Sequence, residues 1–223
     1  MFDINIKTNV REIERALNDF AYKQMPKAVE AATNSVAKKI AVAQVANMQK
    51  VLDRPTPFTL KSVGVRLARK QNNYTATIYI KDLAASYLEP YEFGGVNKLN
   101  GRALLDPVDA KTNQYGNLPR NMLAQLKNRK DIFIGVVKGK NGQQINGVWQ
   151  RPFIRKNQKI RGKSIVPKGS NTTGHLKLLI RFEDAHPVKQ HLGWRALAAA
   201  MVKKLMNREI GTALARAIAI ANK

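Results

Sequence analysis

Two long segments with helical spacing and many alanines most constrain what this chain can fold into. Residues 27–52 carry an apolar side chain every three or four positions, which is the spacing of one helix face: Val29, Ala32, Val36, Ile40 and Ala43. Residues 192–221 repeat the pattern in a second stripe: Trp194, Leu197, Met201, Leu205, Ile210, Leu214 and Ile218. Because alanine adds little bulk to a helix surface, we expect two slim helices that approach other elements closely.

Prolines mark the expected ends of the first long helix. Pro26 suits a first turn, because proline lacks the N–H that a first turn leaves unpaired. A separate short helix is expected before it, at residues 10–20. Pro55 and Pro57 follow the other end, and the residue before a proline is disfavoured in the helical region.

Alternating apolar and polar residues predict β-strands, since successive side chains on a strand point to opposite faces. The segments with this pattern are residues 2–7, 63–67, 74–80, 132–137, 145–150 and 176–182. Turn-forming residues at 71–73 and 140–142 separate two neighbouring pairs. We therefore expect a single α+β domain, residues 1–223, with an antiparallel sheet of about five or six strands packed on the two long helices.

Residues 82–131 form the longest stretch without a clear pattern, and they are rich in glycine and proline. An irregular segment of this size in a compact domain is typical of an interface element. One helix is predicted inside it, at residues 118–127, with Asn117 as its N-cap and Pro119 in its first turn.

Positive charge is the strongest signal in the composition. The chain has 39 Lys and Arg against 15 Asp and Glu, a formal net charge of +24. Residues 131–190 hold 12 of the basic and three of the acidic residues, and no acidic residue lies between Asp131 and Glu183. A surplus of this size indicates a polyanion or an acidic partner near the protein.

The densest basic stretch, residues 151–171, is expected to form an arm, because its glycines and proline do not build a helix face. Its cations are Arg151, Arg155, Lys156, Lys159, Arg161, Lys163 and Lys168. Since an ordinary solvated surface mixes both signs of charge, we interpret the arm as a contact with nucleic acid or with an acidic neighbouring subunit. The alternative is a solvated loop whose charge only aids solubility.

Residues suited to catalysis or to cofactor binding are scarce. Without cysteine, the chain has no thiolate zinc site, disulfide or cysteine nucleophile. His186 and His191 are separated by Pro187 and do not share a helix face. The one acidic cluster that a metal-dependent nuclease would need is sparse: Glu89, Glu92, Asp106 and Asp109. Phosphate-binding glycine motifs and a nucleophile elbow are also missing, so we expect no enzyme, metal or cofactor.

The sequence also lacks a membrane signature and a nucleic-acid-binding motif. No apolar stretch approaches about 18 residues, and the N-terminus has no signal-peptide core, so we expect a protein that works or is assembled inside a cell. Trp149 and Phe153 beside the arm either stack on bases or pack at a strand end. Any contact with nucleic acid is expected to involve phosphates, independent of base sequence.

Four stretches occur in a fixed order: RPTPFTLK at 54–61, YLEPYEFGG at 87–95, YGNLPR at 115–120 and HPVKQHLGW at 186–194, before the last helix. Together they resemble the minor tail protein Z family of lambda-like phages and prophages, over about residues 10–220. The second stretch is also similar to the wider group of head–tail joining and tail-completion proteins.

This resemblance implies a structural protein of the virion, with no catalytic site to transfer. Such proteins act late in tail assembly, at the head-proximal end of the tail, and are associated with placing the DNA end for ejection. By this likeness the chain forms a homo-oligomeric, hexameric ring. Its partners are tail terminator or tail tube proteins, head–tail connector proteins and, without base specificity, the genomic DNA in the channel. It would occupy the virion tail after assembly in the host cytoplasm.

Two other functions stay open from the sequence: a neck or tail-terminator joining protein, and a sequence-independent nucleic-acid-binding protein. Within the second stretch, Glu89 and Glu92 are rare acids in a basic protein, and we expect each to form an ion pair, either with a neighbouring subunit or within its own. The other candidates for a subunit interface are Tyr91, Phe93, Gly94 and Gly95. Trp194 is expected to anchor the last helix in the core.

Overall fold

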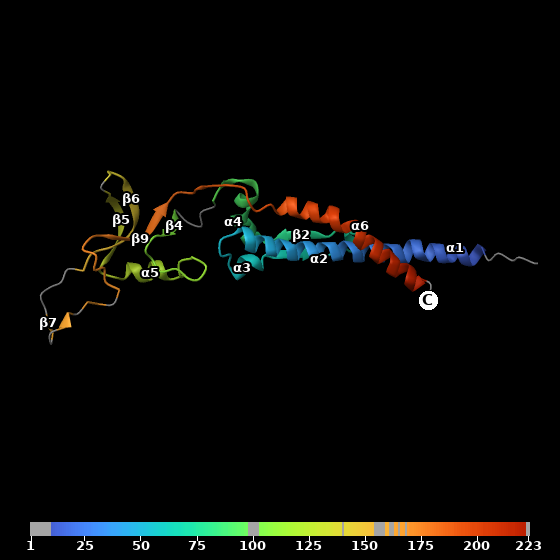
Figure 1. The fold of residues 1–223 in the computed structure, drawn as a ribbon, viewed down its shortest axis with the longest axis horizontal. Coiled ribbons are helices and arrows are strands. Elements are labelled where there is room, and N and C mark those ends of the chain that lie inside the picture. Colours follow the sequence, from blue (N-terminus) through green and yellow to red (C-terminus); the bar gives the residue numbers. More distant parts are fainter. Residues whose placement is uncertain are drawn as a thin grey trace, which may run out of the picture. The chain divides into compact units, whose positions relative to one another are not determined.

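A computed structural model describes residues 10–97, 103–139, 141–153, 159–160, 163–164, 166–167 and 169–221 (Figure 1). The chain divides into two compact units, which we call the helical unit (Met1–Phe93 with Gln190–Lys223) and the sheet unit (Gly94–Lys189). The α+β class is confirmed. Residues 1–223 were expected to form one domain, and within them each of these two units packs around a core of its own. The strand expected at residues 2–7 lies outside the described residues.

The helical unit begins with a nearly unbroken helical run. α1 (Val10–Asp19) continues through a π-helical turn, Phe20–Gln24, into α2 (Met25–Val51). The predicted gap before Pro26 was wrong, because the π turn accommodates the proline. The N–H of Met25 bonds to the Phe20 carbonyl, five residues back, and this wider turn relieves the clash of a proline ring with the preceding turn. As predicted, α2 ends just before the other prolines, where Leu52 is extended.

α4 (Asp82–Phe93) is a second correction, since the sequence analysis expected residues 82–131 to be irregular apart from one later helix. α4 passes through Pro90, which costs an interior helix position about 3 kcal/mol. Its face at three- and four-residue spacing offsets that cost, because Ala84 and Leu88 are buried and Tyr87 and Tyr91 pack beside them. The rest of this core comes from α2, the short α3 (Pro57–Leu60), the start of α6 and two strand residues, Val63 and Ile80.

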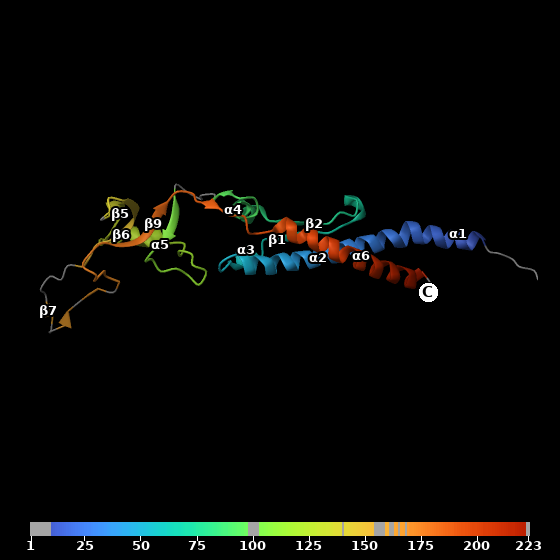
Figure 2. The same ribbon diagram turned by 45° about the horizontal axis from the view of Figure 1, so that its top comes forward.

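α6 (Trp194–Ala221) lies along α2 in both views of the ribbon (Figures 1 and 2). α2 buries a ridge of side chains four residues apart: Ala28, Ala32, Val36, Ile40, Gln44 and Met48. Ridges with this spacing are the ones that most often interlock between packed helices. On α6 the small Ala217 is buried, whereas Ile218, which we predicted on the apolar face, is 48% exposed. Small residues, Ala28 and Ala32 on α2 and Ala217 on α6, therefore line one part of this contact.

Two strands pack on α2. β1 (Val63–Arg66) and β2 (Thr77–Ile80) pair antiparallel, as the alternation predicts. Their connection contains a 3₁₀ turn, Lys70–Asn72, in place of a tight hairpin turn.

The sheet unit contains the largest sheet of the described chain, and it has four strands where five or six were expected. β4 (Leu104–Pro107), β9 (Lys177–Glu183), β6 (Gln144–Gln150) and β5 (Ile132–Lys138) lie side by side in that order, all antiparallel. The remaining strands form short pairs, β3 (Gly95–Val96) with β10 (Pro187–Val188) and β7 (Lys159–Ile160) with β8 (Lys163–Ser164). The strands expected in one sheet thus belong to separate sheets, and of these strands it is β1 and β2 that pack on α2.

A short helix, α5 (Met122–Lys127), covers the core of the four-stranded sheet. It begins later than the predicted residue 118, because Asn117 belongs to a preceding turn. The side-chain oxygen of Asn113 accepts the N–H groups of Tyr115 and Asn117, at 2.9 and 3.0 Å, and so Asn117 does not act as the N-cap.

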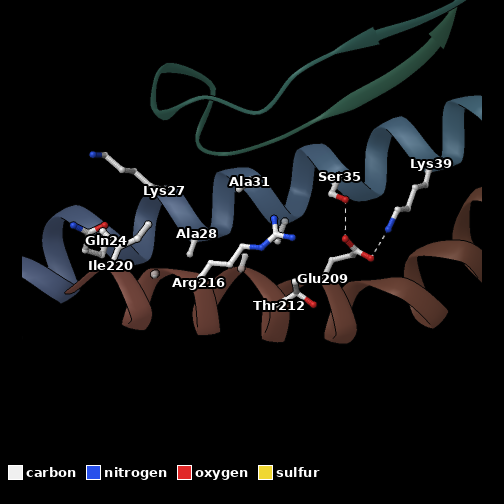
Figure 3. A pocket seen from close by; sticks show the side chains of 13 residues that line it. Gln24, Lys27, Ala28, Ala31, Ser35, Lys39, Glu209, Thr212, Arg216 and Ile220 are labelled. Atoms are coloured by element: carbon white, nitrogen blue, oxygen red, sulfur yellow. Dashed lines mark hydrogen bonds and ion pairs between the residues drawn. The ribbon is translucent and has the colours of Figure 1, made fainter. Parts of the chain in front are cut away.

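Glu209 joins α6 to α2 through its carboxylate (Figure 3). The carboxylate accepts hydrogen bonds from Lys39 Nζ at 2.5 Å and Ser35 Oγ at 2.7 Å. These bonds, the one from Lys39 first, lower the pKa of Glu209 from 4.5 to about 2. An open groove of about 390 Å³ runs beside this cluster, lined mainly by small and polar side chains of the two helices.

We predict that Glu209→Gln lowers the free energy of unfolding at neutral pH and that its difference from wild type disappears in acid. A carboxyl group with a pKa of 4.5 when unfolded and about 2 when folded stabilises the fold fully above the higher value. That contribution is lost as the pH falls through the lower value. Urea unfolding of both proteins from neutral pH to about pH 2 measures the difference. Glu30→Gln, on the partner helix α2 and without an ion pair in the described chain, is the control; a difference that stays constant with pH would contradict the prediction.

Candidate functional site

Three of the four ordered sequence stretches, 54–61, 87–95 and 186–194, meet in the core of the helical unit. Leu60 comes from the first stretch, Leu88 and Tyr91 from the second, and Leu192 and Trp194 from the fourth. The Thr59 and Tyr87 hydroxyls also bond to each other at 2.8 Å. These residues therefore hold α3, α4 and the start of α6 together, which is a structural role. The remaining stretch, residues 115–120, lies in the loop before α5 of the sheet unit.

The second stretch contains the residues we proposed for a subunit interface, and Glu92 has partners within its own unit. Its carboxylate accepts the backbone N–H groups of Trp194 and Arg195, at 2.7 and 3.0 Å. These N–H groups lie in the first turn of α6, where a negative charge is favoured by the helix dipole. Glu92 thus caps a helix that is distant in sequence, a role that the sequence analysis did not identify.

The other interface candidates differ in exposure. Glu89 is exposed on α4 and Tyr91 is half-buried against the ring of His191. Phe93 is 51% exposed, and the guanidinium carbon of Arg195 lies over the face of its ring, 4.8 Å from the ring centre. Gly94 and Gly95 have φ of 76° and 116°, a region that favours glycine. A subunit interface at these positions stays a prediction.

The basic arm is described in part. Arg151 is exposed, with its guanidinium 4.9 Å from the centre of the Phe133 ring. Lys159 and Lys163 lie in the paired strands β7 and β8. The other four proposed cations, Arg155, Lys156, Arg161 and Lys168, lie outside the described residues.

The two ends of the arm lie next to each other in the sheet unit. Pro152 and Asn171 form a parallel bridge, and the N–H of Phe153 donates to the Asn171 carbonyl at 2.7 Å. Residues at the two ends of the predicted arm, 151–171, are therefore joined at one place in the sheet unit. We call this place the arm base: Arg129, Asp131, Gln150, Gly169 and Asn171.

An ion pair stabilises the arm base. Arg129 donates to both carboxylate oxygens of Asp131, at 3.0 and 2.7 Å, and to the Gly169 carbonyl at 2.9 Å. Gln150, which is buried, donates to the same carboxylate at 2.8 Å and to Gly169 at 2.7 Å. The hydrogen bonds from Arg129 lower the pKa of Asp131 below its ordinary value, so the ion pair persists to lower pH than an unpaired aspartate would allow.

Asn171 provides a second set of bonds from a position that is 3% exposed. Its amide nitrogen donates to the carbonyls of Gln150 and His175, at 3.1 and 2.6 Å. Its side-chain oxygen accepts from the N–H and the hydroxyl of Thr173, at 3.0 and 2.6 Å. Because both donors and both lone pairs are used, the amide holds the returning chain in one position.

Three of the five acidic residues of the sheet unit form ion pairs with Lys or Arg of the same unit. Residues 94–189 contain 19 Lys and Arg but only five Asp and Glu. Asp131 pairs with Arg129, Glu183 with Arg181, and Asp109 with Lys177. The arm has no acid of its own in sequence, so its positive charge is available to an external anion. A hollow of about 350 Å³ beside the arm base is lined by Arg129 and Lys177, which are both already paired.

The described residues do not suggest a metal site. No group of three or more His, Asp or Glu close enough to hold a metal ion occurs among them. His186 Nε2 lies 2.6 Å from a Glu183 carboxylate oxygen, and His191 contacts Tyr91 edge-on. Within the same residues, no helix has the length and apolar character that crossing a bilayer requires.

Comparison of the chain with protein-family models, with curated proteins and with solved structures gave no match.

We predict that Asn171→Ala destabilises the arm base by about 2 kcal/mol, because it leaves buried carbonyl and N–H groups without partners. Urea unfolding measures the loss, and hydrogen exchange should become faster around Gln150 and Thr173. Asn141→Ala, at an exposed position in the β5–β6 turn, is the matched control and should have no effect. Wild-type exchange rates in Asn171→Ala would show that the amide does not hold the arm.

Proposed function

We propose that this chain is a structural subunit of a tailed phage or prophage particle, acting in tail completion at the head-proximal end of the tail. The observation that supports this most is the ordered set of four stretches, three of which build one core. Their use in packing fits a structural protein. In this role the chain forms a homo-oligomeric, hexameric ring, takes part in head–tail joining and surrounds the path of the DNA.

The basic arm supplies the contact that this function needs. Its base is held by Arg129, Asp131 and Asn171, so every copy in a ring would present its arm from the same position. Repetition around a channel multiplies the positive charge, and a channel lined with cations attracts the phosphate backbone regardless of base sequence. In this proposal the arm contacts DNA, and an acidic neighbouring protein is the competing partner.

Particles assembled without this chain test the proposal directly. We expect defective tails or heads that fail to deliver DNA, because the joint between head and tail would be incomplete. Electron microscopy and infectivity measure the two effects, and supplying the chain in trans is the control that should restore both. Normal, infectious particles without the chain would exclude the proposed function. A subunit located in the neck, away from the end of the tail, would indicate a neck protein instead.

Charge reversal in the arm separates a DNA contact from a protein contact. We expect replacement of Lys156, Lys159, Arg161 and Lys163 by Glu to leave tail length normal and to reduce DNA delivery by about tenfold or more, because reversed charges repel phosphate. Delivery is measured as infectious units per assembled particle. The control reverses four exposed cations of the helical unit: Lys27, Lys50, Lys203 and Lys204. Loss of tail assembly in the arm variant alone would indicate an acidic protein partner.

A further inference from the structure

The connection between β1 and β2 is a second cationic feature, separate from the arm in sequence. Arg66, Arg69 and Lys70 are exposed, and none of them forms an ion pair in the part of the chain that the structure describes. The sequence from Val65 to Thr77 contains no acid. Glu30, one turn before Asn34 on the neighbouring α2, also forms no described ion pair with them. These three cations are therefore not neutralised within the described part of the helical unit.

Hydrogen bonds to α2 hold this loop in place. The side chain of Asn34 donates to the Ala68 carbonyl at 3.1 Å and accepts the Ala68 N–H at 2.7 Å. Ala68 itself is fully buried, and Figure 3 shows the hairpin alongside α2. A loop fixed to a helix by a two-point amide contact loses little conformational freedom when it binds a ligand.

The loop is also fixed internally. The side chain of Asn72 accepts the Arg69 N–H at 2.6 Å and donates to the Leu67 carbonyl at 2.9 Å. The N–H of Tyr74 bonds to the Arg69 carbonyl at 2.9 Å. Asn73 and Tyr74 both have positive φ, 51° and 55°, a conformation that costs non-glycine residues energy and persists only where the surroundings enforce it. The backbone that carries Arg69 and Lys70 therefore has a defined conformation.

An open hollow of about 400 Å³ lies on this loop, lined by Val65, Arg66, Leu67, Arg69, Gln71 and Asn72. Its charged groups are two guanidinium ions, which only donate hydrogen bonds, and its other polar side chains are amides. The planar fork of donors on a guanidinium ion matches the geometry of phosphate oxygens. The hollow therefore has the charge and the donors to receive a phosphate group.

We propose that the hollow on the β1–β2 loop binds the phosphate backbone of nucleic acid. A protein interface would normally offer an exposed aromatic or aliphatic anchor. In the connection itself the large hydrophobic side chains, Leu67 and Tyr74, are half-buried, and the exposed side chains are polar. The exposed aromatic ring of the hairpin, Tyr79, is 42% exposed and belongs to β2, where it lies over Gly64. Such a polar, cationic surface is typical of contacts to nucleic-acid backbone, which position the protein without reading bases. The inference does not depend on the protein being part of a phage tail.

The test measures binding of the full chain to a fluorescent DNA duplex of arbitrary sequence, by anisotropy at several salt concentrations. The variant replaces Arg66, Arg69 and Lys70 by Gln. We expect its affinity to fall by about tenfold or more and the slope of log K against log salt to decrease by about two to three, one for each phosphate that the variant no longer neutralises. Because the three side chains are exposed, its thermal melting should match wild type.

The matched control replaces Lys50, Lys203 and Lys204 by Gln, which removes the same charge from exposed helical positions. It should keep the wild-type slope. The proposal is overturned if both variants show the same decrease in affinity and slope, since net charge alone would then explain binding, or if the wild-type chain does not bind the duplex.

Two further probes separate the possible sources of the anion. Polyglutamate represents an acidic protein surface, and an equal or greater loss of polyglutamate binding in the loop variant would overturn the proposal in favour of a protein partner. Inorganic phosphate represents a free anion, and it should compete with the duplex only weakly. Competition by phosphate at concentrations comparable to those of the duplex would instead assign the hollow to a small anion and overturn the proposal.

Discussion

The close contact between α2 and α6 is the interaction on which the rest of the helical unit depends. Small residues on the α2 ridge, with Ala217 on α6, allow the two helices to approach. Within that contact, Gln44 and Asn47 of α2 bond to the carbonyls of Trp194 and Leu192 at the start of α6. The backbone N–H groups in the first turn of α6, which have no partner within the helix, donate to the carboxylate of Glu92 on α4. One helix pair thus determines where α6 begins and how α4 is held.

The distribution of charge follows a second constraint, which is that acids are few and mostly used inside the fold. Glu92 caps a helix, Glu209 joins two helices, and Asp131 holds the arm base. Cations of the arm and of the β1–β2 loop have no acids in their own segments. The protein thus presents positive charge beside two places held by hydrogen bonds, the arm base and the β1–β2 loop. This arrangement supports contacts with a polyanion in both proposals.

Regular elements with strong periodicity were predictable, and interrupted ones were not. α2, α6 and the strands β5, β6 and β9 agree with the periodicity to within a few residues. α4 was missed because Pro90 outweighs local helix propensity, and only its buried face, packed on α2 and α6, compensates. The number of strands in the main sheet was overestimated, because alternation predicts that a strand exists and not which strand it joins.

The amino-acid sequence by itself determined the α+β class and the positions of the two long helices. These properties follow from spacing and turn residues over short stretches. Only the tertiary structure decided the partners of Glu92, the four hydrogen bonds of Asn171 and the contact of Asn34 with Ala68. Several of these bonds join residues far apart in the chain, and all need a backbone already folded. Their physical basis is the burial of polar groups that must be paired, which no local pattern encodes.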